Sequence, residues 1–229
     1  MKLINRQVKI CTSIGVKDTY LLKEKVEEAL VSHSDLIEIR VDYFDKIDFF
    51  YIKKVIKGYE KRIILTCRAR SEGGKFKESE IERQKILIKL AKFKPAYIDI
   101  ELSLAQSKPE LIDIIRKLGV LLIISWHDFR DTPPFQILKN TFNKAKFLGD
   151  LVKIVPMANN FMDNLSILKL YEISELDRLI AFCMGEKGQI SRILCPLFGS
   201  PFTYASLSNL PTAPAQITIK ELREFYGLF

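Results

Sequence analysis

Short apolar runs recur along the chain between more polar stretches, and most of them are rich in β-branched or aromatic residues. Runs of this length and composition are typical of buried β-strands. They begin about 20 to 35 residues apart, which is close to the length of one strand plus one helix. The predicted strands are residues 9–14, 36–43, 62–68, 97–102, 121–127, 151–156, 179–185 and 202–206.

The stretches between these runs repeat apolar residues at helical spacing. In the first of them, Leu22, Val26 and Leu30 fall on one face. The predicted helices are residues 19–31, 79–93, 109–118, 135–147 and 219–226. Strands that alternate with amphipathic helices indicate a parallel sheet. Eight such units in 229 residues predict an α/β protein with one domain over residues 1–229, a single (β/α)₈ TIM barrel.

A barrel of this kind carries its reacting groups at the carboxyl ends of the strands and in the loops that follow them. In this chain those positions hold ten ionisable side chains. They are Glu38, Arg40, Asp42, Arg68, Glu72, Asp99, Glu101, His127, Lys153 and Arg192. Such charges cost stability when they are buried unless something pairs them.

Lys153 stands alone among the apolar residues of the sixth predicted strand. If its side chain points into the barrel, burial disfavours the charged form and frees the amine as a nucleophile toward a carbonyl. If it points outward, it is an ordinary lysine that extends to water. The pattern alone leaves both interpretations open.

His127 ends the fifth predicted strand, where an imidazole can act as general acid and base, although a structural core histidine fits the same position. In the run Glu38 to Asp42, polar and apolar residues alternate, so the three charged side chains share one face of the second strand. Arg68 ends the third predicted strand, and Glu72, four residues later, lies directly before Gly73 and Gly74. This stretch predicts either a tight ligand-binding loop or a plain surface turn.

Arg192 follows Gly185, Gly188 and Ser191. A guanidinium can bind a carboxylate through two hydrogen bonds, and the alternative is a surface salt bridge. The sequence contains no G-x-G-x-x-G, Walker A, H-E-x-x-H or G-x-S-x-G pattern. Its histidines and cysteines are too few and too scattered to predict a metal site.

The charge balance raises a question about partners. The net charge is +8 and the pI about 9.2, which would suit a nucleic acid or an anionic substrate. The lysines and arginines are spread over the chain without a dense basic run, so we predict no nucleic-acid partner. Hydrophobic residues make up 48% and charged residues 28%, a composition that supports a sizeable core and not a disordered chain.

No apolar stretch is long enough to span a bilayer, and the first residues lack the hydrophobic region of a signal peptide. The four cysteines, at positions 11, 67, 183 and 195, show no C-x-x-C spacing and are predicted to be buried, reduced thiols. We therefore expect a cytoplasmic protein without a membrane partner.

Several short motifs add to these candidates when they are taken in order. They are E-I-R-V-D at 38–42, C-R-A-R-S-E-G-G at 67–74, S-W-H-D-F at 125–129, V-K-I-V at 152–155, M-G at 184–185, S-R at 191–192, F-G-S at 198–200 and T-A-P-A-Q at 212–216. Each is weak alone, but their order and spacing make the combination specific. Over nearly its whole length the chain resembles type I 3-dehydroquinate dehydratase, an enzyme of the shikimate pathway.

The resemblance implies a (β/α)₈ barrel that uses neither metal nor cofactor. It also implies removal of water from 3-dehydroquinate to give 3-dehydroshikimate, a step in the biosynthesis of chorismate and the aromatic amino acids. Lys153 would form a Schiff base with the substrate, His127 would transfer protons, and Glu72 would orient that histidine. The implied substrate-binding residues are Glu38, Arg40, Arg68, Arg192, Thr212 and Gln216. Arg192 would bind the substrate carboxylate.

The chain departs from the family pattern at a few positions. Thr212 stands where many members have serine, and Pro201 and Phe202 replace the small residues expected after 198–200. We expect little change in chemistry from the threonine, because its hydroxyl remains. The chain is also shorter than bacterial members of the family, and we expect a homodimer.

Two other functions fit part of the same pattern. A class I aldolase or transaldolase also carries a Schiff-base lysine on a barrel strand, but the sequence shows no convincing phosphate loop. A non-catalytic or nucleic-acid-binding barrel would fit the pI, and it would require an inert Lys153.

Overall fold

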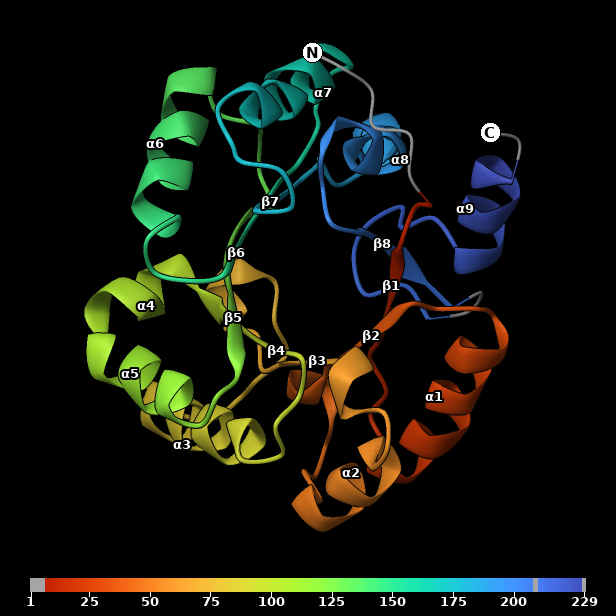
Figure 1. Cartoon of the computed structure of the whole chain (residues 1–229), viewed down its shortest axis with the longest axis vertical. Coiled ribbons are helices and arrows are strands. Elements are labelled where there is room, and N and C mark those ends of the chain that lie inside the picture. The colour runs from red at the N-terminus through yellow and green to blue at the C-terminus, as the bar shows by residue number, and fades with distance from the viewer. Residues whose placement is uncertain (1–6, 208–209, 228–229) are drawn as a thin grey trace.

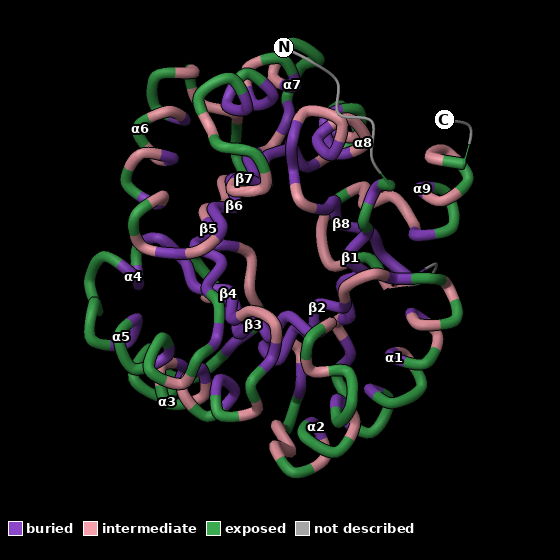
Figure 2. The backbone as a smooth tube through the Cα atoms, in the orientation of Figure 1, coloured by how far each residue is buried: buried purple, intermediate pink, exposed green. Residues whose placement is uncertain are grey.

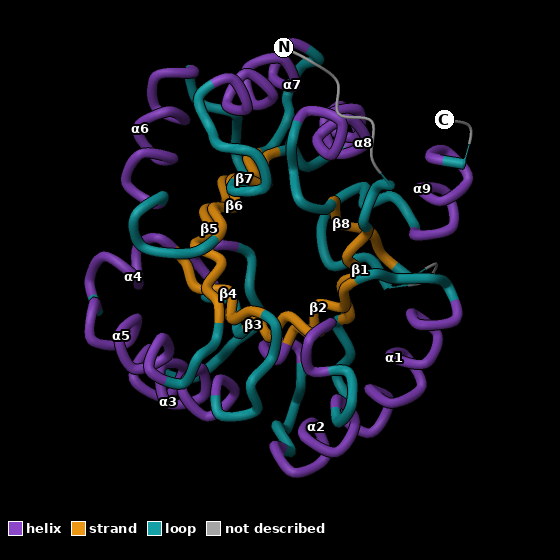
Figure 3. The backbone as a smooth tube through the Cα atoms, viewed as in Figure 1, coloured by secondary structure: helices purple, strands orange, loops and turns teal. Residues whose placement is uncertain are grey.

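The computed structural model describes residues 7–207 and 210–227 of the chain. Eight parallel strands form one curved sheet in the order β7-β6-β5-β4-β3-β2-β1-β8. They are β1 (Ile10–Ile14), β2 (Leu36–Arg40), β3 (Ile63–Thr66), β4 (Tyr97–Glu101), β5 (Leu121–Asp128), β6 (Leu151–Pro156), β7 (Leu179–Ala181) and β8 (Thr203–Ser206). The strands surround a central axis, and the helices form a ring outside them (Figures 1 and 3). The predicted (β/α)₈ barrel is confirmed.

The outer ring consists of helices that follow the strands. They are α1 (Leu22–Val31), α2 (Phe49–Ile56), α3 (Glu80–Ala91), α4 (Leu102–Ser107), α5 (Pro109–Lys117), α6 (Phe135–Ala145), α7 (Met162–Leu168), α8 (Gln189–Phe198) and α9 (Ile219–Tyr226). The five predicted helices correspond to α1, α3, α5, α6 and α9. The apolar pattern did not predict α2, α4, α7 or α8. Of these, α4 and α7 are shorter than eight residues, and α8 contains Pro196 inside the helix.

Alternation along the strands separates two cores. In β2, Ile37 and Ile39 are fully buried in the apolar layer between sheet and helices, whereas Glu38 and Arg40 reach the central pocket. The buried residues follow the strands and the inner faces of the helices, and the exposed residues lie on the outside (Figure 2). The barrel interior at its carboxyl end is therefore polar by construction.

Four predicted strands end early, and the second and the seventh are shortened most. The second ends at Arg40, because residues Val41–Tyr43 form a 3₁₀ turn, η2. The seventh ends at Ala181, and only an isolated bridge between Met157 and Met184 continues it. Within the described residues, β7 and β8 lie at the two ends of the strand order and share no hydrogen-bonded ladder. The barrel thus has one seam, between β7 and β8.

Within the part of the chain that the structure describes, every helix is too short or too polar to cross a membrane.

Candidate active site

A pocket lies at the carboxyl ends of the strands, where the predicted site residues converge. All nine of them line it: Glu38, Arg40, Arg68, Glu72, His127, Lys153, Arg192, Thr212 and Gln216. They come from β2, β5 and β6, from the segments after β3 and β8, and from α8. The structure therefore brings together residues that are up to 178 positions apart, the separation of Glu38 and Gln216 (216 − 38).

Lys153 points into the barrel, which is one of the two orientations that the sequence left open. Its residue is 5% exposed, and its Nζ lies 3.5 Å from Glu38 Oε1 and 3.4 Å from Asp99 Oδ2. The face of the Tyr204 ring lies 4.0 Å from the same nitrogen. Two buried carboxylates and one ring face therefore surround the nitrogen that would attack a carbonyl.

Glu38 is fixed by neighbours on both sides. The hydroxyls of Ser13 and Thr66 donate to its two oxygens at 2.6 and 2.8 Å. Burial raises the pKa of the Glu38 carboxyl, but the charges of Lys153 and Arg40 outweigh it, so the pKa lies below its usual value. Glu38 therefore remains a carboxylate beside the amine.

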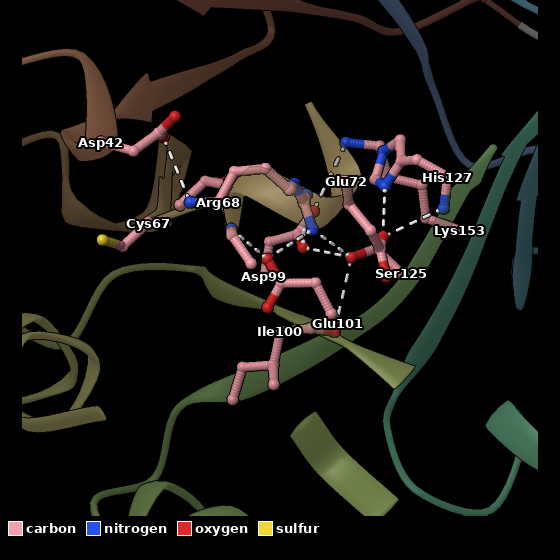
Figure 4. Close-up of polar contacts among 12 residues, drawn as sticks. Asp42, Cys67, Arg68, Glu72, Asp99, Ile100, Glu101, Ser125, His127 and Lys153 are labelled. Atoms are coloured by element: carbon pink, nitrogen blue, oxygen red, sulfur yellow. Dashed lines mark hydrogen bonds and ion pairs between the residues drawn. The ribbon is translucent and has the colours of Figure 1, made fainter. Parts of the chain in front are cut away.

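Arg68 is the centre of a buried polar network between β3, β4 and β5. Its guanidinium contacts Asp99 at 2.7 Å, the Ser125 hydroxyl at 2.6 Å and Glu101 at 3.3 Å (Figure 4). Burial raises the pKa of the Asp99 carboxyl, but the charges of Arg68 and Lys153 outweigh it, so the pKa lies below its usual value. This network fixes Asp99, one of the two carboxylates that hold Lys153.

Glu101 links this network to the outer helices. Arg83 reaches in from α3 and donates to Glu101 Oε2 and to the Cys67 carbonyl, each at 2.7 Å. The other oxygen of Glu101 accepts from the backbone N–H of Ala69 at 2.8 Å. The start of the loop that carries Glu72 is therefore anchored by a buried ion pair.

Arg40 pairs with Asp42 through two hydrogen bonds of 2.9 and 2.8 Å. The prediction that both charges lie on one face of a continuous strand is wrong in detail, because Asp42 belongs to the turn η2. The turn brings the Asp42 carboxylate back onto the guanidinium. The same carboxylate also accepts hydrogen bonds from the backbone N–H groups of Arg68 and Lys75. Asp42 thus joins the second and third strand ends.

His127 and Glu72 form a close pair. Glu72 ends the short helix η4 (Arg70–Glu72), and its Oε2 lies 3.0 Å from both the Nδ1 and the backbone nitrogen of His127. Burial raises the pKa of Glu72 to about 8 against the opposing charge of Arg68. Burial, together with the charges of Arg68 and Lys153, lowers the pKa of His127 well below its usual value. The imidazole is therefore neutral at neutral pH, and with Nδ1–H donating to Glu72 its Nε2 is free to accept a proton.

The glycines after Glu72 are needed where they stand. Gly73 has a positive φ of 77°, and a Cβ on it would lie 2.1 Å from the Phe129 ring. A Cβ on Gly74 would lie 2.0 Å from the Arg68 carbonyl oxygen. The stretch is therefore a tight loop against the pocket and not a plain surface turn.

Arg192 is a buried cation of a different kind. The prediction placed it in a loop after the seventh strand, but it lies in the first turns of α8 and is 2% exposed. Its Nη1 donates to the Tyr204 carbonyl at 3.3 Å, and its guanidinium lies 4.3 Å from the centre of the Phe182 ring. Among residues 7–207 and 210–227, no carboxylate forms an ion pair with it, and its Nε has no hydrogen-bond partner. Burial lowers the pKa of Arg192 to about 10. Such a group is ready to bind an anion.

Thr212 and Gln216 close the segment after β8 over the pocket. The Gln216 Oε1 accepts from the Thr212 N–H at 2.9 Å and from its hydroxyl at 3.2 Å, while the Gln216 Nε2 donates to the Ala205 carbonyl at 3.0 Å. Both residues are half-buried. Their mutual bonds show that Thr212 keeps a polar function within this segment.

Some residues of the site were not assigned a role from the sequence. The alternation in 97–102 could have marked Asp99 and Glu101 as an inward-facing pair, just as it marked Glu38 and Arg40. Arg83 carried no such signal, because it lies among the charged residues of an ordinary amphipathic helix. Phe182 and Tyr204 carried none either, since aromatic residues in strands usually indicate core packing.

The pocket brings together a buried amine, a neutral imidazole and a guanidinium that lacks a carboxylate partner among the described residues. An amine and a general base suit a ketone with a removable proton on the neighbouring carbon. The guanidinium suits a carboxylate on the same molecule.

Comparisons with known proteins agree on one family. The family model for type I 3-dehydroquinase matches residues 10–229. The chain is 40% identical over 204 residues to 3-dehydroquinate dehydratase of Pyrococcus abyssi, covering 88% of this chain and 91% of that one. It is 37% identical over 221 residues to the protein of the same name from Methanobrevibacter smithii, covering 95% and 96%. The crystal structure of 3-dehydroquinate dehydratase from Geobacillus kaustophilus superposes with a TM-score of 0.87 at 27% identity, covering 100% and 95%.

Proposed function

The chain belongs to the type I 3-dehydroquinase family, and we propose that it acts through an imine between Lys153 and its substrate. The activity is that of 3-dehydroquinate dehydratase, a hydro-lyase that converts 3-dehydroquinate to 3-dehydroshikimate on the route to the aromatic amino acids. One observation supports the proposed mechanism above all. The amine of Lys153 is buried in the same pocket as a neutral imidazole and a guanidinium without a carboxylate partner among the described residues.

The first step joins enzyme and substrate. The Lys153 amine, after losing its proton, attacks the ketone carbon of 3-dehydroquinate, and the oxygen leaves as water to give a protonated imine. Glu38 and Asp99 lie within hydrogen-bonding or ion-pair distance of that nitrogen and can accept its proton. The positive imine withdraws electrons from the neighbouring C–H bond.

The second step is the elimination. His127 takes the acidified proton on Nε2, and the electron pair of the C–H bond forms an enamine. The enamine then expels the β-hydroxyl, to which His127 returns the proton, so that water leaves on the side from which the proton was taken. Hydrolysis of the imine releases 3-dehydroshikimate and restores the amine.

Glu72 supports the imidazole and does not react. It fixes Nδ1 and thereby directs Nε2 into the pocket, and its oxygen faces the positive charge that develops on the ring. Arg192 would bind the substrate carboxylate, because it lacks a carboxylate partner among the described residues. Glu38, Arg40, Arg68, Thr212 and Gln216 would complete the substrate-binding set, either directly or by holding the segments around it.

Borohydride reduction tests the proposal. Treatment with borohydride in the presence of 3-dehydroquinate should fix the imine as a secondary amine, and peptide mapping by mass spectrometry should find the adduct on Lys153. Protein without substrate serves as the control and should remain active after the same treatment. An adduct on another residue, or none during turnover, would contradict the mechanism. Carbon–carbon cleavage in place of a conjugated enone product would instead support the aldolase alternative.

We also propose a cytoplasmic homodimer without a nucleic-acid or membrane partner. The side chains of Phe161, Met162 and Leu165 around the start of α7 and of Ile190 on the adjoining α8 are apolar and 49% to 70% exposed. Such a patch suits contact with a second copy. Sedimentation should give twice the mass of the 26.5 kDa chain, and Leu165→Glu should shift it to the monomer mass.

A further inference from the structure

Two aromatic rings occupy the seam of the barrel. Phe182 directly follows β7 and Tyr204 lies in β8, and their ring centres are 6.2 Å apart. Phe202 packs against the second ring at 5.6 Å. Phe182 and Tyr204 are each 2% exposed and line the pocket. Because β7 and β8 share no ladder in the described residues, side-chain packing by this pair, here called the aromatic shelf, joins the two strands.

Each ring of the aromatic shelf holds one of the two cations that the reaction uses. The Lys153 nitrogen lies 4.0 Å from the centre of the Tyr204 ring, and the Arg192 guanidinium lies 4.3 Å from the centre of the Phe182 ring. The Tyr204 carbonyl also accepts a hydrogen bond from Arg192. The face of an aromatic ring is electron-rich and attracts cations, most strongly where water is excluded.

We propose that the aromatic shelf sets the spacing between the amine and the guanidinium, so that Tyr204 is a further catalytic residue and Phe182 a positioning residue. This inference rests on the proposed roles of Lys153 and Arg192. The shelf selects a ligand whose ketone and carboxylate match that spacing. Tyr204 touches the reacting nitrogen itself, whereas Phe182 acts through the arginine.

The ring suits the chemistry better than another carboxylate would. The nitrogen is neutral when it attacks the ketone and positive as a protonated imine, so the Tyr204 face stabilises the imine more than the free amine. Unlike Glu38 and Asp99, the ring face cannot remove the proton that keeps the imine an effective electron sink. The Tyr204 hydroxyl has no hydrogen-bond partner among the described residues. The ring, not the hydroxyl, is therefore the part that matters.

A kinetic comparison of the two rings tests the proposal. Tyr204→Leu should lower kcat about tenfold or more and change KM by no more than about twofold, because a buried cation–π contact is worth about that factor. Phe182→Leu should raise KM about tenfold with kcat nearly unchanged, since the carboxylate contact is equally present in ground and transition states. Tyr204→Phe should recover most of the kcat that the leucine variant loses. Phe142→Leu, which removes a buried ring from α6 outside the pocket, should leave both constants at the wild-type values.

The outcomes separate this inference from the proposed function. If wild-type protein gives the reduced adduct on Lys153 but Tyr204→Leu keeps full kcat, or if both leucine variants change the same constant equally, the shelf proposal is wrong. If wild-type protein turns over without an adduct on Lys153, the proposed function itself fails. Circular dichroism checks folding, and Tyr204→Met and Phe182→Met, which fill more of the volume, replace any leucine variant that does not fold.

Discussion

The two sides of the barrel interior hold their charges in different ways. On the side of β2 to β5, here called the network side, carboxylates and guanidiniums alternate, and every guanidinium has a carboxylate partner, as Arg68 shows with Asp99 and Glu101. On the side of β7 and β8, here called the aromatic side, Arg192 packs on rings and lacks a carboxylate among the described residues. Lys153, on β6, touches both sides.

The difference shows which part of the site is complete without substrate. A buried ion pair whose hydrogen bonds are satisfied positions its members firmly, and removing one member is costly. A buried cation without a partner costs stability until an anion binds to it. In the proposed mechanism the network side therefore positions the catalytic groups, whereas the aromatic side gives up stability to keep a cation available for an anionic ligand.

The largest effect is expected where the two sides meet. Lys153→Met should lower kcat about 10⁴-fold or more, because no imine can form and the remaining groups do not act alone. Steady-state assays of enone formation measure this loss. Lys144→Met, on the exposed face of α6, is the matched control and should keep wild-type activity. Substantial activity in Lys153→Met would show that the amine at the junction is not the nucleophile.

The next effect concerns the base on the network side. His127→Ala should lower kcat about 10²- to 10⁴-fold, which is the usual contribution of a positioned acid or base. Imine formation does not need the imidazole, so the substrate adduct on Lys153 should still be trapped by borohydride. Loss of trapping in a folded His127→Ala protein would mean that His127 is required before elimination.

Much of this arrangement could be predicted from the sequence. Alternation with a period of two put Glu38 and Arg40 on one face of the second strand, which the structure shows to be the barrel interior, and the strand–helix rhythm predicted the barrel. The pairing of Lys153 with two carboxylates could not be foreseen, because it depends on which of eight strands lie beside and across from one another. The helical position of Arg192 was missed for a local reason. The two glycines before it indicated a loop, whereas Gly188 actually caps the start of α8.

A stability comparison sharpens the contrast between the two sides directly. Arg68→Met should lower the free energy of unfolding by about 3–5 kcal/mol, because Asp99 and Glu101 lose their buried partner. Arg192→Met, the same arginine-to-methionine substitution, should leave the free energy of unfolding unchanged or raise it by about 1 kcal/mol. It removes a cation that has no carboxylate partner among the described residues.

Urea unfolding at neutral pH measures both values. The same Arg192→Met protein should lose about 2–4 kcal/mol of binding to transition state and substrate, seen in kcat/KM. Equal destabilisation by the two methionine variants would remove the distinction between the sides.

The smallest effect is a pH dependence that belongs to the network side alone. Glu72 keeps its proton in the folded protein up to pH about 8, whereas the unfolded chain releases it near the ordinary value of 4.5. Unfolding therefore releases a proton in this window, and stability falls as the pH rises. The contribution of His127 to stability changes with pH in the opposite direction. Its lowered pKa means that the unfolded chain takes up a proton below 6.5, so that its contribution is complete above that pH and is lost as the pH falls.

Between pH 6.5 and 8 only the Glu72 contribution varies, and it amounts to about 2 kcal/mol over this range. The free energy of unfolding of wild-type protein should fall by that amount, and the slope should disappear in Glu72→Gln, whose amide does not titrate. Glu110→Gln, on the exposed side of α5, should keep the wild-type slope. If Glu72→Gln keeps the slope as well, the carboxyl at 72 is ionised throughout. The imidazole would then face a carboxylate and not a carboxylic acid.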